Sequence, residues 1–401
     1  MGGHDEPVTA AVAADDGSII PQVQAGKAID AKLAELGGTA VLGEPTMPVS
    51  PTPDHIGYFR HFANRWSIYW TPETDAHEVH GAIRDKWAAF GWEIGLGYPT
   101  TDETEAPDTV GRFNHFSGGT MDRASIYWTP RTGAHEVHGD IHDKWAALGW
   151  EKDLGYPVAD EVANPDAVTH GRYSAFERGF ISWSPDTGAT DHANGTHYSF
   201  SVDSLVCRVT RSGSILGGGK DTLIVTARAD IGPQQIGPVT KNIGDVAAIS
   251  LGAPSMGYLQ PHPIGLVASF DADDPAAPTV VSFQINNSAD GDTTDLRNAA
   301  REGFDTMKSA AVGAAVGSIG GVPGAAVGAV IGVLWSAIGK NLFANCDGPI
   351  AADSVHVSGA TLNDQTGSGR HSETKNYPGV DSPGACGDNS NYDVTWSIGR
   401  A

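Results

Sequence analysis

Apolar residues recur at helical spacing in the first half of the chain. Two copies of the pattern place apolar side chains at positions i, i+4 and i+7: Ile83, Trp87 and Phe90, and Ile141, Trp145 and Leu148. These positions share one face of a helix, so each copy predicts a short amphipathic helix. A related stretch at residues 29–37 predicts a third helix. A glycine ends all three copies, which is a helix-stop signal.

Two further motifs follow each predicted helix. A Leu-Gly-x-Pro box stands at residues 42–45, 96–99 and 154–157. Short aromatic and β-branched runs bounded by Gly and Pro then predict β-hairpins at residues 57–72, 111–130 and 171–185. Each unit is therefore expected to be a helix, a turn and a hairpin. We predict that three copies stack into one repeat domain over residues 25–195, behind an amino-terminal tail of residues 1–24.

The second half of the chain has a different pattern, of short strand-like runs. Residues 199–209 alternate between apolar and polar and predict a strand, and residues 222–228, 264–270, 279–286 and 392–398 are further predicted strands. Short strands separated by Gly, Pro and Asp turns are typical of an antiparallel β-sandwich, here over residues 196–401. The sandwich has only a general resemblance to bacterial C2-like domains. Residues 186–195 are rich in turn formers and are the predicted linker, and the fold class is α+β.

One long segment of the second half carries no charge, from Ser309 to Gly339, and Pro323 divides it. Its small residues recur at four-residue spacing, which lets helices approach each other closely. Each half is shorter than the roughly 20 apolar residues that span a membrane. We therefore predict a Gly/Ala-rich helical hairpin inserted at about 297–343. Two interpretations stay open: a hairpin buried against the sandwich, and one that enters a membrane and contacts lipid.

The charge balance excludes one class of partner. The chain has 25 Lys and Arg residues against 48 Asp and Glu, a net charge of −23. Nucleic-acid binding depends on cationic side chains at the phosphates, so no nucleic-acid partner is expected. The sequence also lacks a Gly-x-Ser-x-Gly elbow and a P-loop, which favours a non-catalytic protein. An enzyme whose site the sequence does not reveal is the alternative.

Metal and cysteine chemistry give two weaker expectations. Acidic loops flank one predicted strand, and carboxylate oxygens there are Ca²⁺ candidates: Asp271, Asp273, Asp290, Asp292 and Asp295. Solvated acidic turns are the other interpretation, and no other cofactor is expected. Cys346 and Cys386 lie in irregular polar stretches and are the predicted disulfide, whereas Cys207 lies in a predicted strand and is expected to be a buried thiol.

The repeated motifs resemble the LGFP-repeat family of actinobacterial cell-envelope proteins. The family signature combines the Leu-Gly-Phe/Tyr-Pro box, a Gly-Arg-Phe/Tyr segment, an Ile-Tyr-Trp strand and a Gly-Ala-His-Glu-Val-His-Gly end, here at residues 133–139. The resemblance covers about residues 25–195. It implies attachment to arabinogalactan or peptidoglycan, in a secreted or cell-envelope protein. Residues 1–7 do not have the pattern of a signal peptide, so we expect that one has been removed. The first box has Glu44 in place of an aromatic residue, and the last copy ends at Thr190-Asp191-His192, so these copies are expected to be caps that bind no ligand.

Sugar rings pack their C–H faces on aromatic side chains, and neighbouring polar groups bind the hydroxyls. The candidates for these contacts are Tyr69, Trp70, His77, His80, Tyr127, Trp128, His135, His138 and Trp183. Strand alternation predicts that one of Tyr69 and Trp70 points inward and the other outward. The helical Trp87 and Trp145 are expected in the core. The two histidines of His-Glu-Val-His are three residues apart, unlike the four of a metalloprotease helix, which leaves zinc as a minor interpretation.

We therefore predict a non-catalytic envelope protein whose repeats bind cell-wall polysaccharide. The alternative is a membrane-active effector or toxin, targeted by its repeats and inserted by the hairpin.

Overall fold

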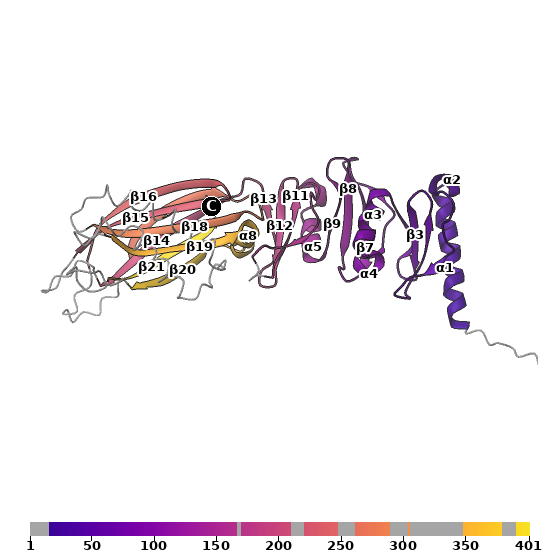
Figure 1. The fold of residues 1–401 in the computed structure, drawn as a ribbon, viewed down its shortest axis with the longest axis horizontal. Coiled ribbons are helices and arrows are strands. Elements are labelled where there is room, and N and C mark those ends of the chain that lie inside the picture. The colour runs from indigo at the N-terminus through magenta and orange to yellow at the C-terminus, as the bar shows by residue number, and fades with distance from the viewer. Residues whose placement is uncertain are drawn as a thin grey trace, which may run out of the picture. The chain divides into compact units, whose positions relative to one another are not determined.

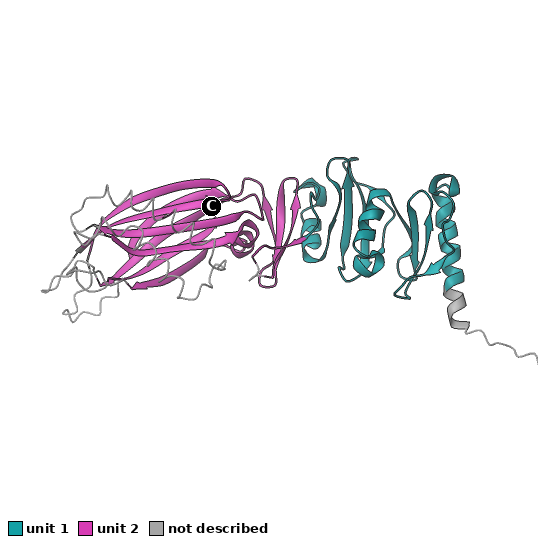
Figure 2. Ribbon diagram, in the orientation of Figure 1, with its two compact units in different colours: residues 1–161 teal, residues 162–401 magenta. Residues whose placement is uncertain are grey.

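The computed structural model describes residues 16–166, 170–209, 220–247, 261–288, 304, 348–378 and 390–401. Contacts divide the chain into two compact units, residues 1–161 and 162–401 (Figure 2). The predicted hairpin at 297–343 lies outside the described residues, apart from Phe304, which is buried in the sandwich core. Cys346 and Cys386 also lie outside the described residues, so their disulfide stays a prediction.

The first unit begins with a long helix that covers one face of a small antiparallel sheet (Figure 1). The elements are α1 (Asp16–Glu35), α2 (Thr39–Leu42), β1 (Ser50–Pro51), β2 (Tyr58–Phe62), β3 (Trp66–Thr71) and β4 (Asp75–His80), with the strands paired in chain order. Residues 16–24, which were expected to belong to an amino-terminal tail, are therefore helical.

The next copy repeats this arrangement with shorter helices. Its elements are α3 (Gly81–Ala89), α4 (Trp92–Gly95), β5 (Gly97–Pro99), β6 (Thr104–Glu105), β7 (Arg112–Gly118), β8 (Ala124–Thr129) and β9 (Gly133–Val137), followed by α5 (Gly139–Ala147) and the 3-10 turn η1 (Trp150–Lys152). The strand order is β5-β7-β8-β9, and β6 pairs with β7. Each predicted two-stranded hairpin is therefore part of a larger sheet, because the His-Glu-Val-His segment supplies a third strand, β4 or β9.

The first sheet is buried on both of its faces. On one face, Trp70 packs with Ala25 and Ile29 of α1. On the other, Tyr69 packs with Ile83 and Trp87 of α3. The side chains do alternate along β3, but Tyr69 and Trp70 are each only 3% exposed. The prediction that one of them points outward is wrong, because a second helix covers the second face.

The second unit contains the third repeat sheet and the sandwich. The third sheet is β10 (Val162–Ala163), β11 (Arg172–Phe176), β12 (Gly179–Ser184) and β13 (Gly188–Ala193). The predicted linker at 186–195 is therefore largely a strand. Within it, His192 is fully buried and its ring lies 3.0 Å from both Tyr198 and Asp273. These contacts explain why the third sheet belongs to the same compact unit as the sandwich.

In the part of the chain that the structure describes, the sandwich consists of two four-stranded antiparallel sheets. One sheet has the order β17-β14-β21-β20, from β14 (His197–Val209), β17 (His262–Asp271), β20 (His371–Pro378) and β21 (Asn391–Arg400). The other has the order β16-β15-β18-β19, from β15 (Lys220–Ile231), β16 (Gln234–Ala247), β18 (Pro278–Ser288) and β19 (Gly348–Ser358). All five predicted strands are present. Three strands, β16, β19 and β20, were not predicted.

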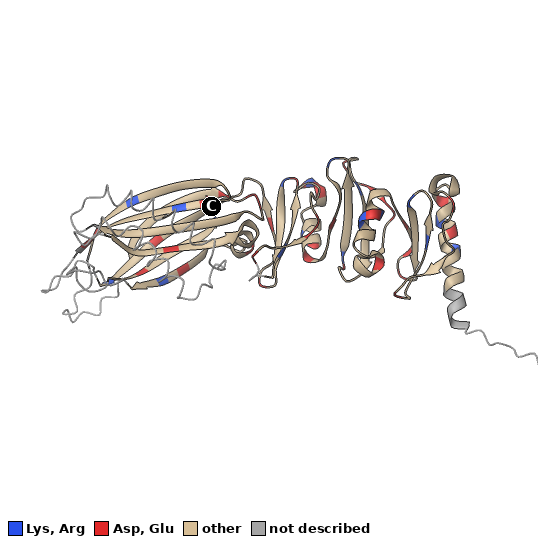
Figure 3. Cartoon of the chain, in the orientation of Figure 1, with Lys and Arg blue, Asp and Glu red and all other residues tan. Residues whose placement is uncertain are grey.

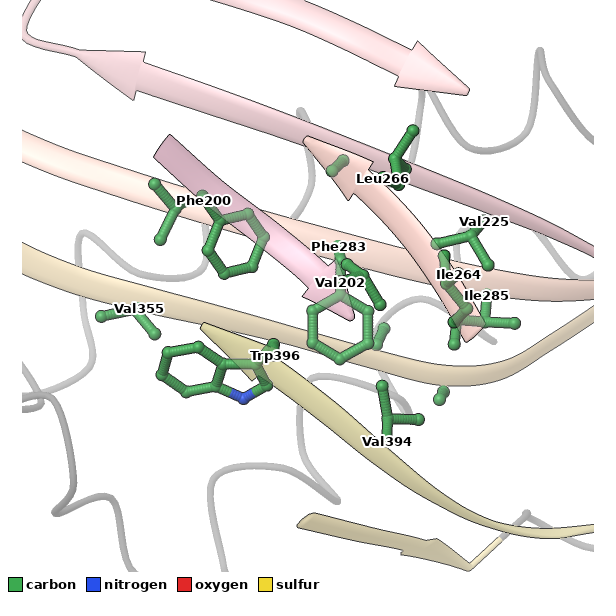
Figure 4. Packing of buried hydrophobic residues seen from close by; sticks show 14 of the residues in the cluster. Phe200, Val202, Val225, Ile264, Leu266, Phe283, Ile285, Val355, Val394 and Trp396 are labelled. Atoms are coloured by element: carbon green, nitrogen blue, oxygen red, sulfur yellow. The ribbon is translucent and has the colours of Figure 1, made fainter. Parts of the chain in front are cut away.

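A single apolar core joins the two sheets (Figure 4). Phe200 and Trp396 come from one sheet, and Phe283 and Val225 come from the other. The alternating sequence of β17 produces a strictly alternating burial pattern, with one side of the strand in this core. Cys207 is a buried free thiol, as predicted, and burial raises its pKa to about 11.

Candidate functional site

The tyrosine of each Leu-Gly-Tyr-Pro box joins its repeat to the preceding one. The hydroxyl of Tyr98 donates a hydrogen bond to Asp54 (2.6 Å), and that of Tyr156 donates to Asp108 (2.6 Å). A Cβ atom on Gly111 would lie 2.5 Å from Cε1 of Tyr156, so the ring requires glycine beneath it. The box aromatic is therefore a structural joint between repeats. The first box follows α1 rather than a repeat, which explains how it tolerates a glutamate.

The His-Glu-Val-His strand forms a second joint. The buried carboxylate of Glu78 accepts hydrogen bonds from the backbone N–H of Glu103 (2.9 Å) and from the ring of His80 (2.9 Å). Burial, together with the charge of Glu78, raises the pKa of Glu103 to about 7. The next copy repeats these contacts through Glu136, which binds Glu161 and His138. The motif thus joins one repeat to the Asp-Glu dipeptide of the next, at residues 102–103 or 160–161.

The first histidine of each His-Glu-Val-His motif lies close to an aspartate of the next repeat. His77 lies 3.1 Å from Asp102, which Lys32 also contacts at 2.8 Å. His135 lies 3.2 Å from Asp160, which Lys86 contacts at 2.7 Å. Figure 3 shows acidic and basic residues together on the repeat helices. Side chains of the four predicted histidines keep exposures of 14–30%, so their contact with a ligand stays a prediction.

Most of the predicted aromatic candidates lie in the core. Tyr69, Trp70 and Tyr127 are each 3% exposed and have no ring face open to a ligand in this structure. Trp128 and Trp183 are half-buried. Trp87 and Trp145 are fully buried, as expected. The aromatic residues that line the surface are different ones.

Two equivalent clusters of mostly half-buried aromatic and polar side chains recur in the repeats. The first cluster contains Phe59, His61, Tyr69, Arg84 and Trp92, and the second contains Phe113, His115, Tyr127, His142 and Trp150. In each, a phenylalanine stacks on the buried tyrosine, with ring centroids 4.9 and 4.8 Å apart. The half-buried tryptophan approaches the histidine to 5.4 and 5.3 Å. Each cluster therefore offers an aromatic surface beside a polar ring.

A serine positions the polar groups of each cluster. Ser67 lies 2.7 Å from Nδ1 of His61 and accepts a hydrogen bond from Nε of Arg84 (2.6 Å). Ser125 binds His115 and His142 in the same way. Burial lowers the pKa of His61 to about 4, and the charge of Arg84 adds to the effect. Burial likewise lowers the pKa of His115 to about 4. Both rings are therefore neutral at neutral pH and can donate and accept hydrogen bonds.

The cluster tryptophans have an unusual backbone. Trp92 and Trp150 have φ angles of 56° and 63°, in the left-handed region that bulky residues avoid. Strain of this kind concentrates at functional sites, and here it occurs at the same position in two copies. Its sequence signal is Gly-Trp-Glu after each helix, at residues 91–93 and 149–151. A second signal is Phe-x-His, at residues 59–61 and 113–115. Both patterns are visible in the sequence, but neither was predicted to form part of a binding site.

Among the residues that the structure describes, the third copy has no such cluster, and a helix of the same unit packs on its sheet. Ser182 stands at the position that Tyr69 has in the first copy, and it accepts a hydrogen bond from Asn363 of α8 (Gly359–Thr366) at 2.9 Å. Asp166, in the turn equivalent to that of Asp108, accepts from the backbone of Ser358 (2.6 Å). Helix α8 therefore replaces the contacts of a following repeat, which agrees with the expectation that the third copy is a cap.

The Ca²⁺ candidates have other partners where the structure describes them. Asp271 pairs with His197, and Asp273 binds His192 and the backbone of Gly195. Asp290, Asp292 and Asp295 lie outside the described residues. Within the described ranges, no group of three or more His, Cys, Asp or Glu side chains could hold a metal ion. None of the helices in these ranges is long and apolar enough to cross a membrane.

Comparison with known families agrees with the repeat structure. The model of the LGFP repeat matches three times, at residues 42–95, 96–153 and 154–196. A search of curated proteins gave no significant match. Residues 42–196 of this chain are therefore three LGFP repeats, a module typical of cell-envelope proteins.

Proposed function

We propose that this is a non-catalytic, secreted or envelope-bound protein whose LGFP repeats bind cell-wall polysaccharide through the two aromatic clusters. The observation that carries the proposal is the repetition of one partly exposed surface. A strained tryptophan, a phenylalanine and a neutral histidine recur with nearly the same geometry in two repeats. Joints between repeats need no such surface, because the box tyrosine and the His-Glu-Val-His strand already make them.

The chemistry of the clusters suits a glycan. Half-buried indole and phenyl rings offer apolar faces to the C–H side of a sugar. A neutral imidazole that is bound to serine through Nδ1 leaves its Nε2 atom for one hydrogen bond with a sugar hydroxyl group. Two sites on one chain that bind a repetitive polymer act together, since the second binding event is intramolecular. Arabinogalactan and peptidoglycan are the polymers that we propose as ligands.

Co-sedimentation of the full chain with insoluble wall polysaccharide tests the proposal. The double variant Trp92→Ala, Trp150→Ala removes one aromatic face from each cluster and should lose most of the bound fraction. Ile94→Ala is the matched control, because Ile94 is 47% exposed on α4 and belongs to neither cluster. Equal sedimentation of the double variant and the wild type would disprove the assignment. Loss of binding in Ile94→Ala as well would show a general effect of changes around α4.

A further inference from the structure

The two clusters differ at one matched position of the repeat. Helix α3 carries Arg84 where α5 carries His142. Both side chains bind the cluster serine, and both lie against the cluster tryptophan. The guanidinium carbon of Arg84 is 5.0 Å from the Trp92 ring centre, and the ring of His142 is 5.1 Å from that of Trp150. Their side-chain exposures are also similar, 17% and 14%.

The charged groups around this position also make the first cluster more positive than the second. In the first cluster, Arg65 pairs with Asp85, and Arg84 lies 3.8 Å from the same carboxylate. Two guanidinium groups therefore share one carboxylate. The pKa of Arg84 is lowered by burial and by the charge of Arg65, as expected for adjacent cations.

In the second cluster, one guanidinium meets two carboxylates. Arg123 pairs with Asp140 at 3.0 Å and also with Asp143. The position of Asp140 is occupied by Ala82 in the first copy. Burial lowers the pKa of His142, so this ring adds no charge at neutral pH. Counted over these groups, the first cluster is more positive than the second by two charges, and the carboxylates of Glu93 and Glu151 act equally on the two clusters.

We propose that the two clusters bind different saccharide units: the first takes a unit with an anionic group, and the second takes an uncharged unit. The inference rests on the proposed function and concerns the same sites. In the first cluster, the sugar ring lies against Trp92 and its anionic group meets the Arg84 guanidinium. A guanidinium group binds carboxylate and phosphate oxygens through the same kind of charged hydrogen bond, so the anionic group is a carboxylate or a phosphate. In the second cluster, Asp140 and Asp143 repel such a group.

The experiment follows the indole N–H signals of Trp92 and Trp150 in ¹⁵N spectra of the full chain. Signals are assigned with Trp92→Phe and Trp150→Phe. The probes are glucose, glucuronic acid and glucose 1-phosphate, which share a ring and differ in the charged group. From the Trp92 signal, we expect at least one of the acidic probes to have a dissociation constant about fivefold lower than that of glucose. This difference is a typical effect of one exposed ionic contact. The stronger of the two acids identifies the anion. The preference should shrink at high salt.

Exchange of the matched residues is the decisive control. Arg84→His should abolish the preference at Trp92. His142→Arg combined with Asp140→Ala should create it at Trp150. Unchanged indole signals of the buried Trp87 and Trp145 show that the variants fold. Equal responses to all three probes at both tryptophans would overturn this inference and leave the proposed function intact. No response at either tryptophan, to these probes or to soluble wall oligosaccharides, would overturn both.

Discussion

At the scale of single residues, the repeat joints depend on tight contacts between a glycine and a box tyrosine. Gly111→Ala places a methyl group 2.5 Å from the Tyr156 ring and 2.6 Å from its hydroxyl. We expect the free energy of unfolding to fall by about 1–3 kcal/mol, the usual effect of overpacking. Urea unfolding followed by tryptophan fluorescence measures it. Gly26→Ala in α1 is the control, because nothing lies within 4 Å of its Cβ position. Equal stability of the two variants would contradict this description of the joint.

The cluster histidines give a second prediction, for the pH dependence of stability. Burial holds the pKa values of His61 and His115 near 4, below the ordinary value of 6.5. The unfolded chain therefore takes up protons between pH 6.5 and 4 that the folded protein does not bind. This contribution to stability is complete above pH 6.5 and is lost as the pH falls toward 4.

The double variant His61→Asn, His115→Asn cannot titrate at these positions. Its melting temperature should fall less than that of the wild type between pH 6.5 and 4. Thermal unfolding at a series of pH values measures the difference between the two proteins. Parallel curves would show that these rings are not held neutral.

At the scale of elements, helix α8 ties the third repeat to the sandwich through one fully buried side chain. Asn363 donates to Ser182 and to the carbonyl of Thr190, and it accepts from Tyr198 and Arg400. Asn363→Ala removes these four hydrogen bonds from a fully buried position. We expect a loss of about 2–3 kcal/mol in the unfolding of the second unit. Ser368→Ala, just after the helix, should be close to neutral because Ser368 is exposed. A similarly small loss in Asn363→Ala would contradict the role of α8.

The sequence was informative where one apolar periodicity decided the element. Helices α3 and α5 and the five predicted strands each bury a regular apolar face. Strands β4 and β9 were missed because Asp-Ala-His-Glu-Val and Gly-Ala-His-Glu-Val look polar. Their glutamates are buried by partners in the next repeat, which no local pattern reveals. The inward and outward positions of β3 were mispredicted for a similar reason, since α1 and α3 cover opposite faces.

The candidate site was only partly predictable. The motifs indicated which segments carry aromatic residues, but the exposed members depend on the turn after each helix. Trp92 follows Gly91, and both residues have positive φ angles, which turns the indole toward His61. Composition alone could not distinguish this tryptophan from the buried Trp87.

At the scale of the whole molecule, the boundary between the two compact units falls between residues 161 and 162, inside the third repeat. A fragment of residues 162–401 keeps the partners of α8, whereas a fragment of residues 196–401 exposes Asn363 and the apolar residues beside it. We expect the longer fragment to melt cooperatively and the shorter one to be less stable or to aggregate. Differential scanning calorimetry compares them. Equal melting temperatures would show that the sandwich does not need the third sheet.

The central claim is that wall polysaccharide contacts the strained tryptophans of the two clusters. Oxidation of the full chain with N-bromosuccinimide, followed by peptide mapping, reports the accessibility of each indole directly. Without polysaccharide, Trp92 and Trp150 should be oxidised well before the buried Trp87 and Trp145. On insoluble arabinogalactan or peptidoglycan, Trp92 and Trp150 should become protected while the buried pair is unchanged. Undiminished oxidation of Trp92 and Trp150 in chains that remain bound to the polysaccharide would contradict the account.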